Sequence, residues 1–435
     1  MYRSRRFVLS GGFAAAALTL TGCGVATDGA GGDSGAGAGA SDGEVNGDIT
    51  FQTWNLKGGF EEYFTQLISD FEEKYPEANV EWRDLPAEGY VDKLSADAAA
   101  GNLSDVVDMS PPAAYTLATA GMLVNLAEAV PEAEADYLPE AWEGMTFPRL
   151  EEGTYGFPWY LNTGPYFFNT ELFEKCGLDP ANLPTTYDEL FDQGDVMAEN
   201  CDDVTMIGHL PTIETLGEYG VQLMDEDAAE FTFNGPKAVE LIRRFADLYE
   251  AGGFTDESLN NLLTGEVDAF KAGQVASMPG SAYTLTELKT TAKDVYESVE
   301  ISPAIANTAP SMAIHTLVVN ESSKNQATAL AFAHFATNPA NQMAFAKEAS
   351  IFPSASGLLD DPYFTEEDST DESRVRVETA KQVAEAKVWA PPMFPEASKT
   401  FLHDQVAQAV MGKKDPQDAL DDAVQYANER IATTE

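Results

Sequence analysis

Basic residues are scarce in this chain. Of its 435 residues, 25 are lysine or arginine and 72 are aspartate or glutamate, so the formal net charge is −47 at pH 7. A surface with this excess of negative charge repels phosphates and anionic lipid headgroups, which argues against charge-driven binding to nucleic acid or to a membrane surface. The acidity does not identify a ligand, because a solvated acidic face has the same composition.

Signatures of catalysis and of metal binding are also missing. The chain has no G-x-S-x-G nucleophile elbow, no G-x-x-x-x-G-K-[ST] phosphate loop and no H-E-x-x-H helix. The four histidines, His209, His315, His334 and His403, lack the spacing of paired metal ligands. Among so many carboxylates some pair will stand at glycosidase separation by chance, so their presence does not support hydrolysis. We therefore expect no catalytic residue, no metal and no cofactor.

Long apolar runs are confined to the first 22 residues, so we expect nothing after them to span a bilayer. Residues 1–22 carry Arg3, Arg5 and Arg6 and no acid ahead of the apolar run, which is the layout of a secretory signal peptide. The sequence LTGC, which ends at Cys23, resembles the lipobox of bacterial lipoproteins. This resemblance implies that the Cys23 thiol carries a diacylglycerol anchor with acyl chains such as palmitate. Sec and twin-arginine export both remain open.

The segment from residue 23 to residue 48 predicts a lipidated cysteine followed by a disordered linker. Residues 24–48 are mostly small or polar and have little to bury, and their reach is on the order of 25–30 Å. Such a tether would hold the folded part at the extracellular face of the cell membrane. In an exported protein the two remaining cysteines, Cys176 and Cys201, favour a disulfide, with two reduced buried thiols as the alternative.

The rest of the chain alternates strand and helix patterns. It is too long for one core, so two lobes are expected. Residues 49–54, 79–83 and 105–109 predict strands, and the segments between them predict amphipathic helices. This βαβαβ order favours an α/β fold with mostly parallel sheets between helices, and such sheets bind ligands at the carboxyl ends of their strands.

Several aromatic residues stand at strand ends or next to proline. Trp54 ends a predicted strand, Trp159 lies in the sequence GFPWY, and Trp389 precedes APP. A rigid apolar face edged by polar groups suits a sugar ring, which packs its C–H face on the aromatic ring while its hydroxyls form hydrogen bonds. Packing in the core is the alternative for each of them.

Several sequence landmarks appear in the order typical of one protein family. They include ITFQTW at 49–54, KLSADAAAGNLSDVVDMSP at 93–111, the two halves TYGFPW and FNTELF at 154–159 and 168–173, and the long segment at 317–342. The chain resembles the extracellular solute-binding lipoproteins of bacterial ABC importers, in family 1, which binds sugars and includes the maltose-binding proteins.

This resemblance implies a two-lobed, type II periplasmic-binding-protein-like fold with a hinge between the lobes. One lobe would comprise 49–153 with 307–362, and the other 154–306 with 363–435. A mono- or oligosaccharide would bind between the lobes, close them, and be delivered to the permease subunits of an ABC transporter. The protein would act as a monomer and break no bond in its ligand.

The same resemblance and the aromatic pattern give a list of candidate ligand contacts. Aromatic residues would stack on the sugar, and polar residues would bond its hydroxyls. The first wall would be formed by Trp54, Asn55, Asp108, Ser110, Trp159, Tyr160 and Asn162, and the second by Gly280, Ser281, Tyr283 and Trp389. The chain departs from the family at Ala282, where many relatives have an aromatic residue.

Two other functions stay open. An exported carbohydrate-active enzyme, a hydrolase or lyase, would add a carboxylate pair to the same aromatic cleft. A binding protein for a cationic solute such as a polyamine would use the acidity of the chain, and its affinity would fall steeply with salt.

Overall fold

The computed structural model describes residues 43–254, 259 and 265–434, and all of these belong to one compact unit. The expected signal peptide at 1–22, the lipidation site Cys23 and most of the linker at 23–48 lie outside the described residues. Within the described part of the chain, no helix combines the length and the apolar character that a membrane span requires.

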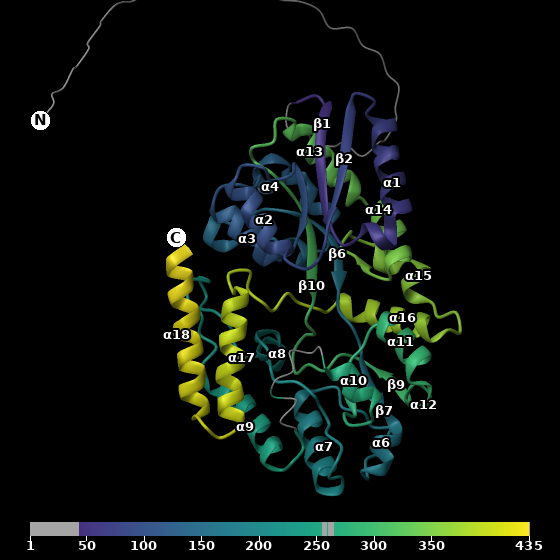
Figure 1. Cartoon of the computed structure of the whole chain (residues 1–435), viewed down its shortest axis with the longest axis vertical. Coiled ribbons are helices and arrows are strands. Elements are labelled where there is room, and N and C mark those ends of the chain that lie inside the picture. The colour runs from purple at the N-terminus through teal and green to yellow at the C-terminus, as the bar shows by residue number, and fades with distance from the viewer. Residues whose placement is uncertain (1–42, 255–258, 260–264, 435) are drawn as a thin grey trace, which may run out of the picture. The chain divides into compact units, whose positions relative to one another are not determined.

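The first layer of the fold is a six-stranded sheet (Figure 1). Its strands, in spatial order, are β11 (Phe352–Pro353), β6 (Phe157–Asn162), β10 (Ala313–Val319), β3 (Val106–Met109), β1 (Gly47–Trp54) and β2 (Ala78–Leu85). The expected βαβαβ unit is present as β1–α1–β2–α2–β3, and β1 pairs in parallel with both β2 and β3.

The rest of this sheet is antiparallel, so the sheet is mixed rather than mostly parallel. β10 runs antiparallel to β3 and to β6, and β11 runs antiparallel to β6. The reason lies in the path of the chain. β6 leads out of this sheet towards a second one and β10 returns from it, so these two neighbours must point in opposite directions.

The second sheet has three antiparallel strands in the order β8 (Ser277–Pro279), β7 (Tyr166–Asn169) and β9 (Val299–Ser302). The chain therefore crosses between the two sheets at residues 163–165 and again at 303–312. β6 belongs to the first sheet, although we expected the second lobe to begin at residue 154. A short hairpin of β4 (Thr146–Phe147) and β5 (Gly153–Thr154) precedes the first crossing.

Helices cover the sheets and contain far more residues than the strands do. Those that precede the first crossing are α1 (Lys57–Lys74), α2 (Tyr90–Ala99), α3 (Pro111–Thr119), α4 (Leu126–Ala129) and α5 (Pro139–Glu143). Between the crossings lie α6 (Thr170–Lys175), α7 (Tyr187–Asn200), α8 (Ile213–Tyr219), α9 (Pro236–Glu250), α10 (Glu266–Lys271), α11 (Ala282–Thr291) and α12 (Lys293–Tyr296). After the second crossing come α13 (Gln326–Ala336), α14 (Pro339–Ala349), α15 (Pro362–Thr365), α16 (Asp371–Val383), α17 (Glu396–Val410) and α18 (Pro416–Thr434). Short 3₁₀ turns occupy Pro131–Asp136, Pro148–Leu150 and Leu358–Asp360.

An aromatic core fixes α1 and α13 on one face of the first sheet. The apolar stripe expected from the sequence buries Phe64, Leu67 and Phe71 of α1. Phe332 of α13 lies edge-on to Phe51 of β1, at 5.0 Å between ring centroids, and also packs against Phe71. These contacts hold the sheet rigid up to the ends of β1 and β3.

A disulfide joins Cys176, which follows α6, to Cys201, which follows α7, with 5.6 Å between their Cα atoms. This is the pairing considered from the sequence. Between the two cysteines, α7 begins with a capping box, in which Thr186 accepts from the backbone N–H of Glu189 and the Glu189 carboxylate accepts in return from Thr186. The backbone N–H of Thr185 also donates to this carboxylate, and this bond, together with those from the Thr185 hydroxyl and from Thr186, lowers the pKa of Glu189.

Removing this disulfide should destabilise the protein. The bond closes a loop with a sequence separation of 25 residues, and the entropy of such a loop in the unfolded chain corresponds to about 3–4 kcal/mol. We expect the double variant Cys176→Ala/Cys201→Ala to lose about that much unfolding free energy in urea titrations. Adding reductant should shift the wild type but not the double variant. A wild type whose urea midpoint does not respond to reductant would contradict this expectation.

Candidate functional site

A cluster of aromatic rings lies at the carboxyl ends of β1 and β3. We call Trp54, Tyr90, Asp108, Tyr160 and His315 the aromatic cluster. Tyr160 of β6 stacks on His315 of β10 with 4.4 Å between ring centroids, because the two residues are register partners on neighbouring strands. The half-buried ring of Trp54 lies 5.3 Å from His315 and 5.6 Å from Tyr90. The expected Trp54 and Tyr160 are therefore brought together, and His315 lies between them.

Asp108 lies under this cluster and is fully buried. Its Oδ1 is 3.3 Å from His315 Nδ1. Burial raises the pKa of Asp108, while the hydrogen bond and charge of His315 act in the opposite direction. None of the Asp108 surface is exposed, and its Oδ2 has no hydrogen-bond partner among the described residues, so its contact with a ligand stays a prediction. Its Oδ1 orients the His315 ring.

A cavity of about 440 Å³ lies where the chain crosses between the sheets. We call it the crossing cavity. Both crossings contribute to its wall, through residues such as Gly164 and Ser311, and the remaining wall comes mainly from the segment 209–218 and the start of α17. Its side chains are a mixture of aromatic, hydroxyl and charged groups: Tyr166, Tyr187, His209, Thr212, Glu214, Thr215, Glu218, Glu396, Lys399 and His403.

Glu218 connects this cavity to the second crossing. Its carboxylate accepts hydrogen bonds from the Tyr187 hydroxyl at 2.7 Å and from the backbone N–H of Ser311 at 2.9 Å. Its backbone carbonyl accepts from the N–H groups of Asn307 and Thr308. Burial raises the pKa of Glu218 to about 7. An acid that changes charge near neutral pH therefore ties the crossing segment to α8.

A second buried pair supports the same wall. His209 Nδ1 lies 2.8 Å from Glu266 Oε1, and both side chains are almost fully buried. Burial alone would lower the pKa of His209, but the charge and hydrogen bond of Glu266 outweigh it and raise the pKa. The same Glu266 oxygen accepts from the backbone N–H of Gly208, which fixes the loop that leads into the cavity.

Two of the expected stacking residues serve other purposes. Trp159 is fully buried and stacks on Phe345 at 5.2 Å in the core of the first sheet, so it does not reach a ligand. Trp389 is half-buried. Its ring packs against the backbone at Gly217, and its indole N–H donates to the carbonyl of Ala309 at 2.8 Å, so it braces the second crossing.

The remaining expected contacts do not gather in one place. Asn55 is exposed just beyond β1, and Ser110 is the half-buried residue that begins α3. Gly280 is buried against the first crossing, where its carbonyl oxygen would lie 2.2 Å from a Cβ on Gly164. Gly280 is thus packed against the first crossing and lines neither cavity, and its contact with a ligand stays a prediction.

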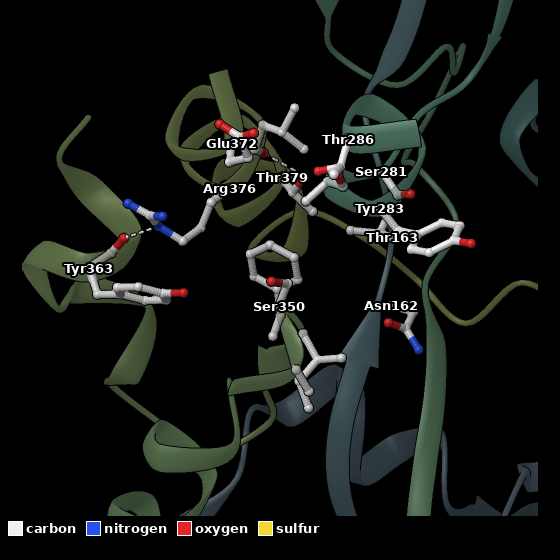
Figure 2. Close-up of a pocket in the computed structure, with 15 residues that line it drawn as sticks. Asn162, Thr163, Ser281, Tyr283, Thr286, Ser350, Tyr363, Glu372, Arg376 and Thr379 are labelled. Atoms are coloured by element: carbon white, nitrogen blue, oxygen red, sulfur yellow. Dashed lines mark hydrogen bonds between the residues drawn. The ribbon is translucent and has the colours of Figure 1, made fainter. Parts of the chain in front are cut away.

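Three further expected residues, Asn162, Ser281 and Tyr283, do lie together, but in another cavity (Figure 2). This second cavity shares Thr163 with the crossing cavity and is otherwise lined by different residues. The sequence thus predicted one site where the structure has an aromatic cluster and two cavities.

Sequence reasoning missed the residues that carry most of the site's polar chemistry: His209, Glu218, Glu266 and His315. Their signal was weak, because single histidines and glutamates without a motif are far more often surface residues. His315 lies in β10 (Ala313–Val319), but no sequence pattern distinguished it from the other three histidines.

Comparison with known proteins agrees with this arrangement. Residues 55–343, more than half of the chain, match the family model described as bacterial extracellular solute-binding protein. The chain belongs to this family.

Individual relatives are more distant. This solute-binding protein is 24% identical over 280 residues to a protein of Brucella abortus (strain 2308) named as a binding protein, a match that covers 61% of this chain and 64% of the relative. The chain thus matches less than two thirds of that relative's length. Over 32% of this chain and 33% of the relative, it is 23% identical to the arabinooligosaccharide-binding protein of Bacillus subtilis (strain 168).

Solved structures show the fold. A protein from Synechococcus sp. MITs9220, described as an oligosaccharide periplasmic-binding protein, superposes with a TM-score of 0.79 at 26% identity, covering 88% of this chain and 99% of the other. The GacH receptor of Streptomyces glaucescens, studied with acarbose, has a TM-score of 0.67 at 20% identity, covering 89% and 99%. This solute-binding protein therefore has the two-lobed, type II periplasmic-binding-protein fold, and its relatives are binding proteins rather than enzymes.

We predict that Trp159→Ala destabilises this solute-binding protein by about 3–5 kcal/mol, because it removes a fully buried indole from an aromatic core. Urea unfolding measures the loss. Trp54→Ala, at a half-buried ring, should cost clearly less. If Trp159→Ala unfolds at the wild-type urea concentration, the placement of this side chain in the core is wrong.

Glu218 should make stability depend on pH. Because its pKa is raised from 4.5 to about 7, the folded protein holds a proton that the unfolded chain loses between these values, so this residue lowers stability as pH rises from 5 to 8. Glu218→Gln removes this effect, and its unfolding free energy relative to wild type should rise over that interval by up to about 3 kcal/mol.

Urea titrations of both proteins at pH 5 and pH 8 measure this difference. Leu216→Val, on the same helix, removes a buried methylene and no titratable group, so its unfolding free energy relative to wild type should be the same at both pH values. A difference between Glu218→Gln and wild type that is the same at both pH values would contradict the shifted pKa.

Proposed function

We propose that this protein binds a mono- or oligosaccharide between its lobes, in the crossing cavity and against the aromatic cluster, and delivers it to the permease of an ABC transporter. The observation that carries the proposal is that both crossings between the sheets line the cavity. A ligand there touches the segments about which the lobes would turn, and it can stabilise a closed state only by binding that state better than the open one.

The chemistry of the two surfaces supports a sugar. The half-buried ring of Trp54 and the neighbouring His315 offer an apolar face, while the hydroxyls and carboxylates of the crossing cavity offer hydrogen bonds. Sugar-binding sites combine these two features, because a pyranose ring has apolar C–H faces and a polar rim. The names of the relatives from Bacillus subtilis and Synechococcus point to the same ligand class.

The glutamates of the cavity favour one alternative. Glu214, Glu218 and Glu396 line it with a single lysine, Lys399, and this excess of acid would suit a cationic solute such as a polyamine. Part of the acid is not free, because Glu218 bonds Tyr187 and Ser311 and its raised pKa keeps part of it protonated at neutral pH. A neutral ligand is therefore our first choice.

We further propose that the protein works at the extracellular face of the cell membrane, as a monomer anchored by lipid at Cys23. The family description, extracellular, supports export. We place the first passage between the lobes at 163–165 and the second at 303–312, where the chain changes sheets. Mass spectrometry of the membrane-extracted protein tests the anchor through the mass added at residue 23.

A thermal-shift screen with matched variants tests the proposed ligand. We expect an oligosaccharide from a panel of arabino- and malto-oligosaccharides to stabilise the protein, by about 2.7 kcal/mol at 100 times its dissociation constant. Trp54→Ala should weaken binding at least tenfold in calorimetry, about 1.4 kcal/mol, by removing an apolar platform. Trp82→Ala is the control, because Trp82 on neighbouring β2 packs against Phe64 in the core.

Three outcomes would contradict the proposal. Stabilisation by spermidine but by no saccharide would favour the cationic ligand. Shortened oligosaccharides after incubation would show an enzyme. Equal loss of affinity in Trp54→Ala and Trp82→Ala would remove the aromatic cluster from the site.

A further inference from the structure

The second cavity, shown in Figure 2, has a volume of about 340 Å³. We call it the α11–α16 cavity. Its wall comes from the end of β6, the start of α11, the α14–β11 connection, α15 and α16. The crossing cavity is lined instead mainly by the segment 209–218 and α17, so the two cavities have different walls and share only Thr163 of the first crossing.

Two tyrosines give this cavity its character. Tyr283, at the start of α11, is 79% exposed and is the most exposed large hydrophobic residue in the described part of the chain. On the other side of the cavity, the ring of Tyr363 stacks on the Arg376 guanidinium at 4.1 Å, and Arg376 Nε donates to the Tyr363 carbonyl at 2.6 Å (Figure 2). Lys347 lies 5.5 Å from the same ring. Tyr363 is thus held in place, and Tyr283 has an open face.

Polar groups without protein partners surround these rings. Among the described residues, neither the hydroxyl of Tyr283, nor that of Tyr363, nor the amide of Asn162 has a hydrogen-bond partner, and Asn162 points towards the cavity from the opposite side to Tyr363 (Figure 2). Ser350 lies between them. The wall therefore offers an aromatic face together with several donors and acceptors at its rim.

The charge of the cavity is balanced. Its charged residues are Arg376 and Glu372, and Glu372 also pairs with Lys289 at 3.5 Å. An ionic ligand would gain little from such a wall, whereas an uncharged ring with several hydroxyls matches both the tyrosine faces and the free polar groups.

We propose that the α11–α16 cavity is a second binding site for a neutral saccharide of one or two rings. Its walls come from segments on both sides of the crossings, so movement of one lobe against the other changes its shape. This linkage rests on the proposed function of the crossing cavity. A ligand in either cavity changes the ligand affinity of the other cavity, and the factor is the same in both directions.

Variants on exposed positions test the second site without disturbing the core. Thr286→Trp places an indole in the cavity, and Tyr283→Ala removes its open ring. Thr290→Trp is the matched control, because Thr290 is exposed on the same helix and does not line the cavity. The probes are D-glucose, L-arabinose and maltose, followed by calorimetry and by saturation-transfer NMR.

We expect wild type and Thr290→Trp to bind one of these probes at two sites, and Trp54→Ala to retain the second. Thr286→Trp and Tyr283→Ala should weaken the second site at least tenfold. One site per wild-type chain for every probe, or unchanged binding in Thr286→Trp, would overturn the second site. If none of the three probes binds, this inference fails, while the oligosaccharide panel still decides the proposed function.

The linkage has its own readout. In Thr286→Trp, the filled cavity should shift the affinity for the best oligosaccharide of the panel at least threefold, whereas Thr290→Trp should leave it at the wild-type value. Equal affinities in the two variants would overturn the linkage between the cavities.

Discussion

Two short crossings, at 163–165 and 303–312, connect the two sheets, and residues of these crossings line both cavities described above. The crossings are held against each other by a hydrogen bond from the Thr163 hydroxyl to the carbonyl of Ser311 at 2.7 Å, and the second is held to α8 by the carboxylate and carbonyl of Glu218. They set the opposite directions of β6 and β10, and thereby the stacking of Tyr160 on His315. Close packing completes the region, since Gly164 has no room for a side chain beside the Gly280 carbonyl. A ligand whose affinity depends on how the two sheets are placed must contact these crossing segments.

The polar groups of the site follow from that constraint. A segment that leaves a sheet exposes backbone N–H and C=O groups that no neighbouring strand can satisfy, and buried groups of this kind need other partners. Glu218 supplies both kinds of partner, an acceptor for Ser311 and a carbonyl for Asn307 and Thr308. The consequence is a largely buried carboxyl group beside the second crossing, whose pKa burial raises to about 7. Its proton and the geometry of the second crossing are therefore linked, whatever ligand occupies the cavity.

Much of the first sheet could be predicted, and the reasons for the failures are physical. The helix at 57–74 has one apolar stripe, which fixes its buried face, and β2 after it begins with alternating buried and exposed residues. In β6 every residue from Phe157 to Leu161 is buried, so periodicity could not tell that Trp159 faces the core while Tyr160 faces the site. The same holds for Asp108, because all four residues of β3 are buried. The partners of Glu218 lie 31 and 93 positions away, separations that no local pattern encodes. The disulfide could be predicted because an exported protein favours oxidised cysteines, and only Cys176 and Cys201 remain beside the lipidation site.

The net charge of −47 is the largest anomaly of the sequence, yet it says little about the ligand. Charge that faces water is screened over about 8–10 Å at physiological salt, whereas a buried carboxylate acts at full strength on whatever it touches. The carboxylates that matter at the site are therefore the few buried ones. Each has at least one partner, His315 for Asp108, His209 for Glu266, and Tyr187 with Ser311 for Glu218, while Oδ2 of Asp108 has none among the described residues. A cation entering the crossing cavity would have to compete with these internal bonds, but a hydroxyl can join them, since it donates to one group and accepts from another. The arrangement of the buried acids thus favours an uncharged, many-hydroxyl ligand in a protein whose surface is strongly acidic.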